Sequence, residues 1–168
     1  MQKTILSLLL FIMMTNVYAQ ETDIKTSTYF LIRHAEKVRT NLNNANPDLN
    51  EIGIKRAQKW KEIFQYIDIQ SIYSTNFIRT IKTVEPISKE KNIEISIYHP
   101  TKIDFEIFKK ETLGKNILIV GHSNTIPQWV NKLIGQEKYH EIADDQFSHL
   151  YIITIKGNQI VDLLLTID

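Results

Sequence analysis

The sequence predicts an α/β fold: a three-layer sandwich in which a mostly parallel β-sheet lies between helices on both faces. Short runs of β-branched, aromatic and aliphatic residues, typical of strands buried on both faces, alternate along the chain with longer amphipathic stretches. No internal repeat or low-complexity segment interrupts this alternation. With 168 residues, of which 43% are hydrophobic and 23% charged, the chain has the length and balance of one globular domain.

The first half of the chain is expected to contain two strands and two helices. Residues 28–32 form a continuous apolar run, which predicts the first strand. After an Asn-rich loop, Asn50 is suited to cap a helix whose buried side is defined by Ile52, Ala57, Trp60, Ile63, Phe64 and Ile67. Residues 69–73 predict the second strand. Residues 77–88 predict the second helix, which Pro86 is expected to kink or to end early.

The second half continues the alternation. Residues 93–98 predict a third strand, and residues 104–111 a weaker helix. Residues 116–121 read as another strand buried on both faces, and residues 124–134 as a helix that Gly135 closes. The last two strands, residues 150–155 and 159–167, are expected to pair through a tight turn at Gly157 and Asn158.

The amino-terminal segment has the pattern of a secretory signal peptide. Lys3 supplies a positive start, residues 5–14 are apolar apart from Ser7, and small residues precede a cleavage position after Ala19. The apolar run is about half of the ~20 residues that a membrane-spanning helix needs, so no stable membrane anchor is expected. We therefore expect residues 1–19 to be a signal peptide, residues 20–27 a flexible lead-in, and residues 28–168 a single domain of an exported, periplasmic or secreted protein.

The charge and the cysteine content exclude two classes of protein. Twenty basic and nineteen acidic side chains leave a formal net charge of +1, which does not provide the positive field of a nucleic-acid-binding protein. The chain has no cysteine, so it has neither a disulfide framework nor a lipid-modified cysteine after the apolar run.

Chemically reactive residues follow three of the predicted strands. Arg33-His34 follows the first, Arg79 lies soon after the second, and Gly121-His122 ends the fourth. Because parallel strands present their carboxyl ends at one edge of the sheet, these side chains are expected to meet there. Two guanidinium groups can hold a dianionic phosphate, and a neutral imidazole can attack phosphorus or carry a proton. Gly121 permits close backbone approach, and the following helix N-terminus favours negative charge.

These residues belong to four motifs that occur in order along the chain. They are Leu-Ile-Arg-His-Ala-Glu-Lys at 31–37, Leu-Asn-Glu-Ile-Gly at 49–53 with Arg56-Ala57, Ile-Tyr-Ser-Thr-Asn-Phe-Ile-Arg-Thr at 72–80 with Thr83, and Ile-Val-Gly-His-Ser-Asn at 119–124. Together they resemble the motifs of the histidine phosphatase superfamily, in its phosphoglycerate mutase-like branch 1. The first motif departs from the usual pattern by having Ala35 in place of Gly.

The resemblance implies a phosphoglycerate mutase-like fold and a role for each matched residue. His34 would be the nucleophile that becomes a phosphohistidine, while Arg33, Arg79 and His122 would bind the phosphoryl oxygens and stabilise the transition state. It implies no metal and no organic cofactor. The function that follows is a metal-independent phosphomonoester hydrolase, and the alternatives are a phosphoglycerate mutase-type phosphotransferase and a catalytically silent phospho-ligand binding protein.

The general acid that protonates the leaving oxygen is not identified by the sequence. Members of this branch usually carry an acid between the second Arg and the second His. The candidates in that interval are Glu85, Glu90, Glu94, His99, Asp104, Glu106 and Glu111, and Asp104 is preferred among the carboxylates. Glu36, just past the nucleophile, is a further candidate.

Several other residues near the motifs have alternative readings. Arg56 and Arg39 are read as surface charges, the alternative being that Arg39 or Lys37 lies at the rim of the pocket and contacts substrate, and Asn41 is a candidate phosphate contact. His140 and His149 are read as structural or solvated. His34, Glu36, His122 and an Asp could together bind zinc, but the guanidinium of Arg33 would repel a dication.

The length of the chain bears on the substrate. Few residues remain for inserted lid segments, so the pocket is expected to be shallow and open. A small phosphomonoester or a phosphorylated protein side chain is the expected substrate, and export argues against a glycolytic mutase. The sequence leaves the physiological substrate and the oligomeric state open.

Overall fold

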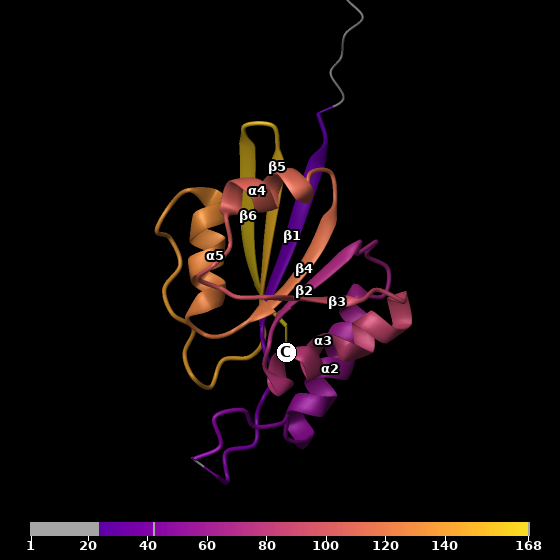
Figure 1. The fold of residues 1–168 in the computed structure, drawn as a ribbon, viewed down its shortest axis with the longest axis vertical. Coiled ribbons are helices and arrows are strands. Elements are labelled where there is room, and N and C mark those ends of the chain that lie inside the picture. Colours follow the sequence, from indigo (N-terminus) through magenta and orange to yellow (C-terminus); the bar gives the residue numbers. More distant parts are fainter. Residues whose placement is uncertain (1–23, 42, 168) are drawn as a thin grey trace, which may run out of the picture.

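A computed structural model, described here for residues 24–41 and 43–167, contains one six-stranded sheet with the order β3-β2-β4-β1-β5-β6 (Figure 1). The strands are β1 Thr26–Arg33, β2 Ser71–Thr75, β3 Ile95–Tyr98, β4 Asn116–Gly121, β5 His149–Lys156 and β6 Gln159–Thr166. The helices are α2 Glu51–Phe64, α3 Ile78–Lys91, α4 Phe105–Glu111 and α5 Thr125–Ile134.

The direction and register of the strands bring the motifs to one edge of the sheet. β1 and β2 each pair in parallel with β4, with Arg33 opposite Gly121 and Ser74 opposite Val120. β3 pairs in parallel with β2, whereas β5 and β6 form an antiparallel hairpin on the other side of β1. The carboxyl ends of β1, β2 and β4 are therefore neighbours, as the sequence predicted.

Side chains of the central strands alternate between two hydrophobic cores. On one face, Phe30 and Ile32 of β1 pack with Trp60 and Phe64 of α2 and with residues of α3. On the other face, Tyr29 and Leu31 pack with Trp129 of α5 and Phe108 of α4. Figure 1 shows α2 and α3 on one side of the sheet and α4 and α5 on the other. The predicted three-layer sandwich is confirmed.

Two local predictions about the helices were wrong. α3 does not end at Pro86 but continues to Lys91, because Val84 and Ile87 on either side of the proline are fully buried and hold the helix against the sheet. Ile52 does not belong to the buried side of α2, since it is 61% exposed. Gly53 occupies that side instead, in close contact with the chain that follows β1.

Only part of the predictions for the amino-terminal segment can be compared with the structure. The predicted signal peptide, residues 1–19, lies outside the described residues. β1 begins at Thr26, two residues earlier than predicted, so Thr26 and Ser27 belong to the strand and not to a flexible lead-in. Ser27 is buried, and its hydroxyl donates a hydrogen bond to the carbonyl of Thr112. Among the helices of residues 24–41 and 43–167, none has the length and apolar character needed to cross a bilayer.

Candidate active site

The structure brings together the four residues that were predicted to form the site. The amide of His34 donates a hydrogen bond of 2.9 Å to the carbonyl of Gly121, which joins the end of β1 to the end of β4. The imidazole rings of His34 and His122 lie 5.5 Å apart, edge to face. Arg79, in the first turn of α3, and Arg33 are close enough for their charges to act on both histidines. Two histidines and two arginines from three segments therefore share one site.

His34 is buried and held in one tautomer. Its Nδ1 lies 2.8 Å from the carbonyl oxygen of Ala35, and because a carbonyl can only accept, Nδ1 carries the proton and Nε2 carries the lone pair. The pKa of His34 is lowered to about 3, chiefly by burial and also by the charges of Arg79, His122 and Arg33, whereas the hydrogen bond to Ala35 acts in the opposite direction. At neutral pH the ring is thus uncharged, with an unprotonated Nε2.

A chain of hydroxyl groups determines the tautomer of His122. The hydroxyl of Thr80 donates to the carbonyls of Thr75 and Phe77, and the hydroxyl of Thr75 donates to Thr80 Oγ1. Thr75 Oγ1 must therefore accept from Nε2–H of His122, 3.0 Å away. This leaves Nδ1 as the acceptor that faces Arg79 Nη2 at 3.5 Å.

Burial and surrounding positive charge keep His122 neutral as well. Burial is the first cause that lowers its pKa to about 4, followed by the charges of Arg79, Arg33 and Lys37. An uncharged His122 can accept a hydrogen bond at Nδ1 or, on protonation, donate one to an anion. The protonation state of His122 therefore depends on the charge of the bound ligand.

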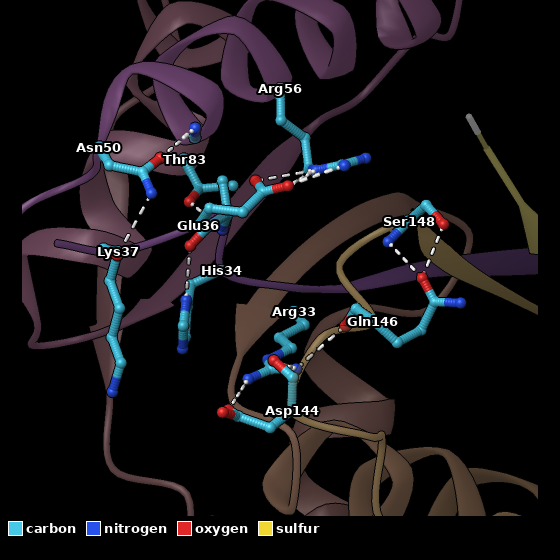
Figure 2. A network of polar contacts seen from close by, with 12 residues as sticks. Arg33, His34, Glu36, Lys37, Asn50, Arg56, Thr83, Asp144, Gln146 and Ser148 are labelled. Carbon is cyan, nitrogen blue, oxygen red and sulfur yellow. Dashed lines mark hydrogen bonds and ion pairs between the residues drawn. The ribbon is translucent and has the colours of Figure 1, made fainter. Parts of the chain in front are cut away.

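The two arginines differ in how the fold holds them. Arg33 is 3% exposed, and its Nη1 donates to the carbonyls of Ala143 and Gln146 at 2.7 and 3.0 Å, while Nη2 bonds Asp144 at 3.1 Å (Figure 2). Arg79 stacks on the ring of Phe77 at 4.3 Å. The Nε–H groups of both arginines are buried without a hydrogen-bond partner in the structure. Because buried N–H donors are rarely left unpaired, these two indicate a place for an anion.

The motif residues that do not touch the site fix the chain that carries it. The amide of Ala35 donates to Thr83 Oγ1 on α3 at 2.9 Å. The amide of Asn50 donates to the carbonyl of Glu36, and a Cβ at Gly53 would overlap that same carbonyl oxygen. Gly53 is therefore required for the close approach of α2 to residues 35–37, the segment that follows His34.

The candidates for the general acid have other partners. Glu36 accepts hydrogen bonds at 2.8 and 2.9 Å from the guanidinium of Arg56 (Figure 2). Asp104 is exposed and caps α4 by accepting hydrogen bonds from the amides of Glu106 and Ile107. His99 is also exposed, and its Nδ1 lies 3.1 Å from the hydroxyl of Thr101.

The remaining candidate carboxylates lie on the outer surfaces of α3, β3 and α4. Glu85 is engaged by Lys89 in an ion pair along α3. The exposed members of the set are Glu90, Glu94, Glu106 and Glu111.

The loop of residues 141–147 is the part of the site that the sequence did not identify. Its carbonyls and Asp144 hold the guanidinium of Arg33, and the ring of Phe147 lies 4.3 Å from that group. Asp144 also pairs with the exposed Arg39 at 2.7 Å. Hydrogen bonds from Arg39 and then Arg33 hold the pKa of Asp144 at about 2, against the opposing effect of burial. No side-chain motif marks this loop, since most of its contacts with Arg33 are made by backbone carbonyls.

Lys37 and Arg39 lie near the charged groups of the site, the alternative that the sequence left open for them. With Asn41 they line a hollow of about 110 Å³. Asn41 is exposed, and its side chain accepts from the amide of Asn43. A second hollow of about 460 Å³, lined by Glu36, Arg39, Ile52, Asp144, Asp145 and Phe147, lies beside the arginine-bearing loop.

The other histidines do not join the site. His140 is exposed in the loop after α5, and His149 packs edge-on against Tyr151 at the start of β5. In the described part of the chain, no three His, Asp or Glu side chains are grouped so that they could hold a metal ion.

Comparison with known proteins shows similarity to one family over part of the chain. Residues 29–99 match the model of the histidine phosphatase superfamily (branch 1). A search of curated proteins found no match. Among solved structures, the proposed phosphohistidine phosphatase SixA of Agrobacterium tumefaciens is 18% identical, with a TM-score of 0.62, over 83% of this chain and 98% of its own.

Two further solved structures share the fold at low sequence identity. A proposed α-ribazole-5'-P phosphatase of Escherichia coli is 15% identical, with a TM-score of 0.67, over 84% of this chain and 96% of its own. A protein histidine phosphatase SixA complexed with tungstate is 13% identical, with a TM-score of 0.66, over 83% of this chain and 96% of its own. In the match of residues 29–99 to the family model and in its fold, the chain is similar to the histidine phosphatase superfamily, branch 1.

Proposed function

We propose that the protein is a phosphohydrolase that transfers a phosphoryl group from its substrate to Nε2 of His34 and then to water. The observation that carries the proposal is the environment of that nitrogen. His34 is buried, uncharged and fixed by Ala35 in the tautomer that leaves Nε2 unprotonated, beside two arginines whose Nε–H groups lack partners. A nucleophile next to unpaired cationic donors is the arrangement that phosphoryl transfer requires.

Binding of the phosphoryl group follows from the charges in the site. The guanidinium groups of Arg33 and Arg79 attract a dianion and offer it their unpaired N–H donors. His122 completes the pocket, because a bound dianion raises the pKa of a nearby imidazole and favours its protonated, donating form. The loop of residues 141–147 holds Arg33 rigidly, so little side-chain entropy is lost when the substrate binds.

Two displacements then complete the reaction. In the first, the Nε2 lone pair of His34 forms a bond to phosphorus as the bond from phosphorus to the leaving oxygen breaks, and that oxygen takes up a proton. In the second, water attacks the phosphohistidine, the N–P bond breaks with its electron pair returning to Nε2, and inorganic phosphate leaves. Arg33, Arg79 and His122 stabilise the charge on the phosphoryl oxygens in both transition states.

The substrate that we propose carries an accessible phosphoryl group, on a small phosphomonoester or on a protein side chain. The hollow beside residues 144–147 leaves the rim open to a bulky substrate. The names of the structural neighbours, which include a protein histidine phosphatase and an α-ribazole-5'-P phosphatase, support both kinds of substrate. We also propose that the enzyme is exported and loses residues 1–19, which is supported by the signal-peptide pattern of that segment.

The test is hydrolysis of p-nitrophenyl phosphate in the presence of EDTA. The wild type is expected to release p-nitrophenol, and His34→Ala is expected to lose the activity by at least about a thousandfold, since its nucleophile is gone. His140→Ala, on the exposed loop, is the matched control and is expected to retain the wild-type rate. Loss of wild-type activity in EDTA with recovery on adding zinc would favour a metal site instead. Tight phosphate binding without turnover would indicate a binding protein.

A further inference from the structure

The release of an alcohol from phosphorus requires a proton, and the described residues at the site leave few donors. Glu36 is engaged by the guanidinium of Arg56. Asp144 is held ionised by Arg39 and Arg33, which keep its pKa at about 2. Guanidinium groups keep their protons at any physiological pH, and the Nε2 proton of His122 faces Thr75. When a bound dianion protonates His122 at Nδ1, that proton is donated to the phosphoryl oxygens. Lys37 is then the group among the described residues of the site whose proton is left for the leaving oxygen.

The backbone of Lys37 is fixed at three points. Lys37 forms an isolated antiparallel bridge with Leu49, and the amide of Val38 donates to the carbonyl of Asp48 at 2.8 Å. The carbonyl of Lys37 itself accepts from the side chain of Asn50 at 3.4 Å. The residue therefore has a fixed place, three positions after the nucleophile.

The side chain of Lys37 extends in parallel with the imidazole of His34 in Figure 2. Its ammonium lies beyond Nε2 in that view. In an in-line displacement the leaving oxygen departs on the side of phosphorus opposite to Nε2. Within residues 24–41 and 43–167 the ammonium of Lys37 forms no hydrogen bond or ion pair, so no group of that part of the chain holds its protons.

The charged groups that face Lys37 come from three segments. Arg79 of α3 and Arg39 and Arg33 of the chain around β1 repel its ammonium, and Asp144 of the 141–147 loop attracts it. Burial and then the repulsion from Arg79 and Arg39 lower the pKa of Lys37. The charge of Lys37 in turn contributes to lowering the pKa of His122.

We propose that Lys37 is the proton donor to the leaving oxygen, an assignment that rests on the proposed function. As the P–O bond breaks, one N–H proton of the ammonium passes to the departing oxygen, which leaves as an alcohol, and the electron pair of that N–H bond stays on the amine. The neutral amine then takes a proton from the water that attacks the phosphohistidine. This restores the ammonium and balances both steps.

The test separates the proton of Lys37 from its charge. Lys37→Arg keeps the positive charge but cannot release a proton. Its effect on the rate therefore depends on how strongly the leaving oxygen of the substrate needs a proton. The rate of phosphohistidine formation is measured in single turnovers with p-nitrophenyl phosphate, phenyl phosphate and an alkyl phosphate. Lys89→Arg, an exposed lysine paired with Glu85 on α3, is the matched control.

The expected result is a loss that grows along this series. With p-nitrophenyl phosphate, whose leaving group needs no proton, the rate for Lys37→Arg stays within about threefold of the wild type, whereas with the alkyl phosphate it falls by about a hundredfold or more. The basic limb of the pH profile for the alkyl phosphate also disappears. An equal loss with all three substrates, or no loss with any, overturns the assignment. Absence of phosphohistidine in the wild type would overturn the proposed function itself, so the two failures are distinguishable.

Discussion

Replacing His34 by Gln should make the protein more resistant to mild acid. The folded state holds the pKa of His34 at about 3, compared with 6.5 for a free histidine, so between these values the unfolded chain binds the proton more strongly. Stability that is present above pH 6.5 is therefore lost progressively as the pH falls toward 3. At pH 5 the single group costs the native state about 2 kcal/mol relative to pH 7.5, since each pKa unit corresponds to about 1.4 kcal/mol.

The assay is urea unfolding of the wild type and His34→Gln at pH 7.5 and pH 5.0. The free energy of unfolding should fall between the two pH values by about 2 kcal/mol less in the variant than in the wild type. This comparison cancels any effect of the substitution that is the same at both pH values. His140→Gln, at an exposed position, controls for the loss of a surface histidine. Equal pH dependence in wild type and His34→Gln would refute the conclusion that the nucleophile is buried in its neutral form.

Three further substitutions test the supports of the site. Gly53→Ala drives a methyl group into the carbonyl of Glu36 and should lower the free energy of unfolding by about 3 kcal/mol, measured in urea. Glu36→Gln weakens the pairing with Arg56 and should cost about 1 kcal/mol, while kcat for p-nitrophenyl phosphate stays within about twofold; a large fall in kcat would restore Glu36 as the acid. Thr75→Val removes the acceptor for Nε2–H of His122 and should lower kcat/KM by about tenfold, with unchanged rates speaking against the deduced tautomer.

The layers of the fold could be predicted because they follow from periodicity. The buried strands of this chain are continuous apolar runs, and its helices present one apolar side, so both signals are local. Pro86 and Ile52 show where local signals fail. The packing of Val84 and Ile87 on the sheet keeps α3 helical through its proline. The helical period alone would also place Ile52 on the buried side of α2, but the close approach of the chain at Glu36 requires Gly53 there.

The four residues of the site could be predicted because each lies next to the end of a parallel strand. The general acid could not, since chain order does not show which carboxylates are engaged elsewhere. Asp104 caps α4, and Glu36 is bound by Arg56, contacts that appear only in three dimensions. The loop that holds Arg33 escaped prediction for a related reason, because backbone carbonyls provide most of its hydrogen bonds and any sequence supplies carbonyls.

The most direct test of the central claim is to trap the phosphoenzyme. The wild type and His34→Ala are mixed with p-nitrophenyl phosphate in EDTA, quenched separately in acid and in alkali within the first turnover, and mapped by mass spectrometry. A phosphoryl group that survives alkali, is lost in acid and maps to Nε2 of His34 is the predicted result. The claim would be contradicted if the wild type hydrolysed the ester without forming this adduct, or if His34→Ala retained the wild-type rate.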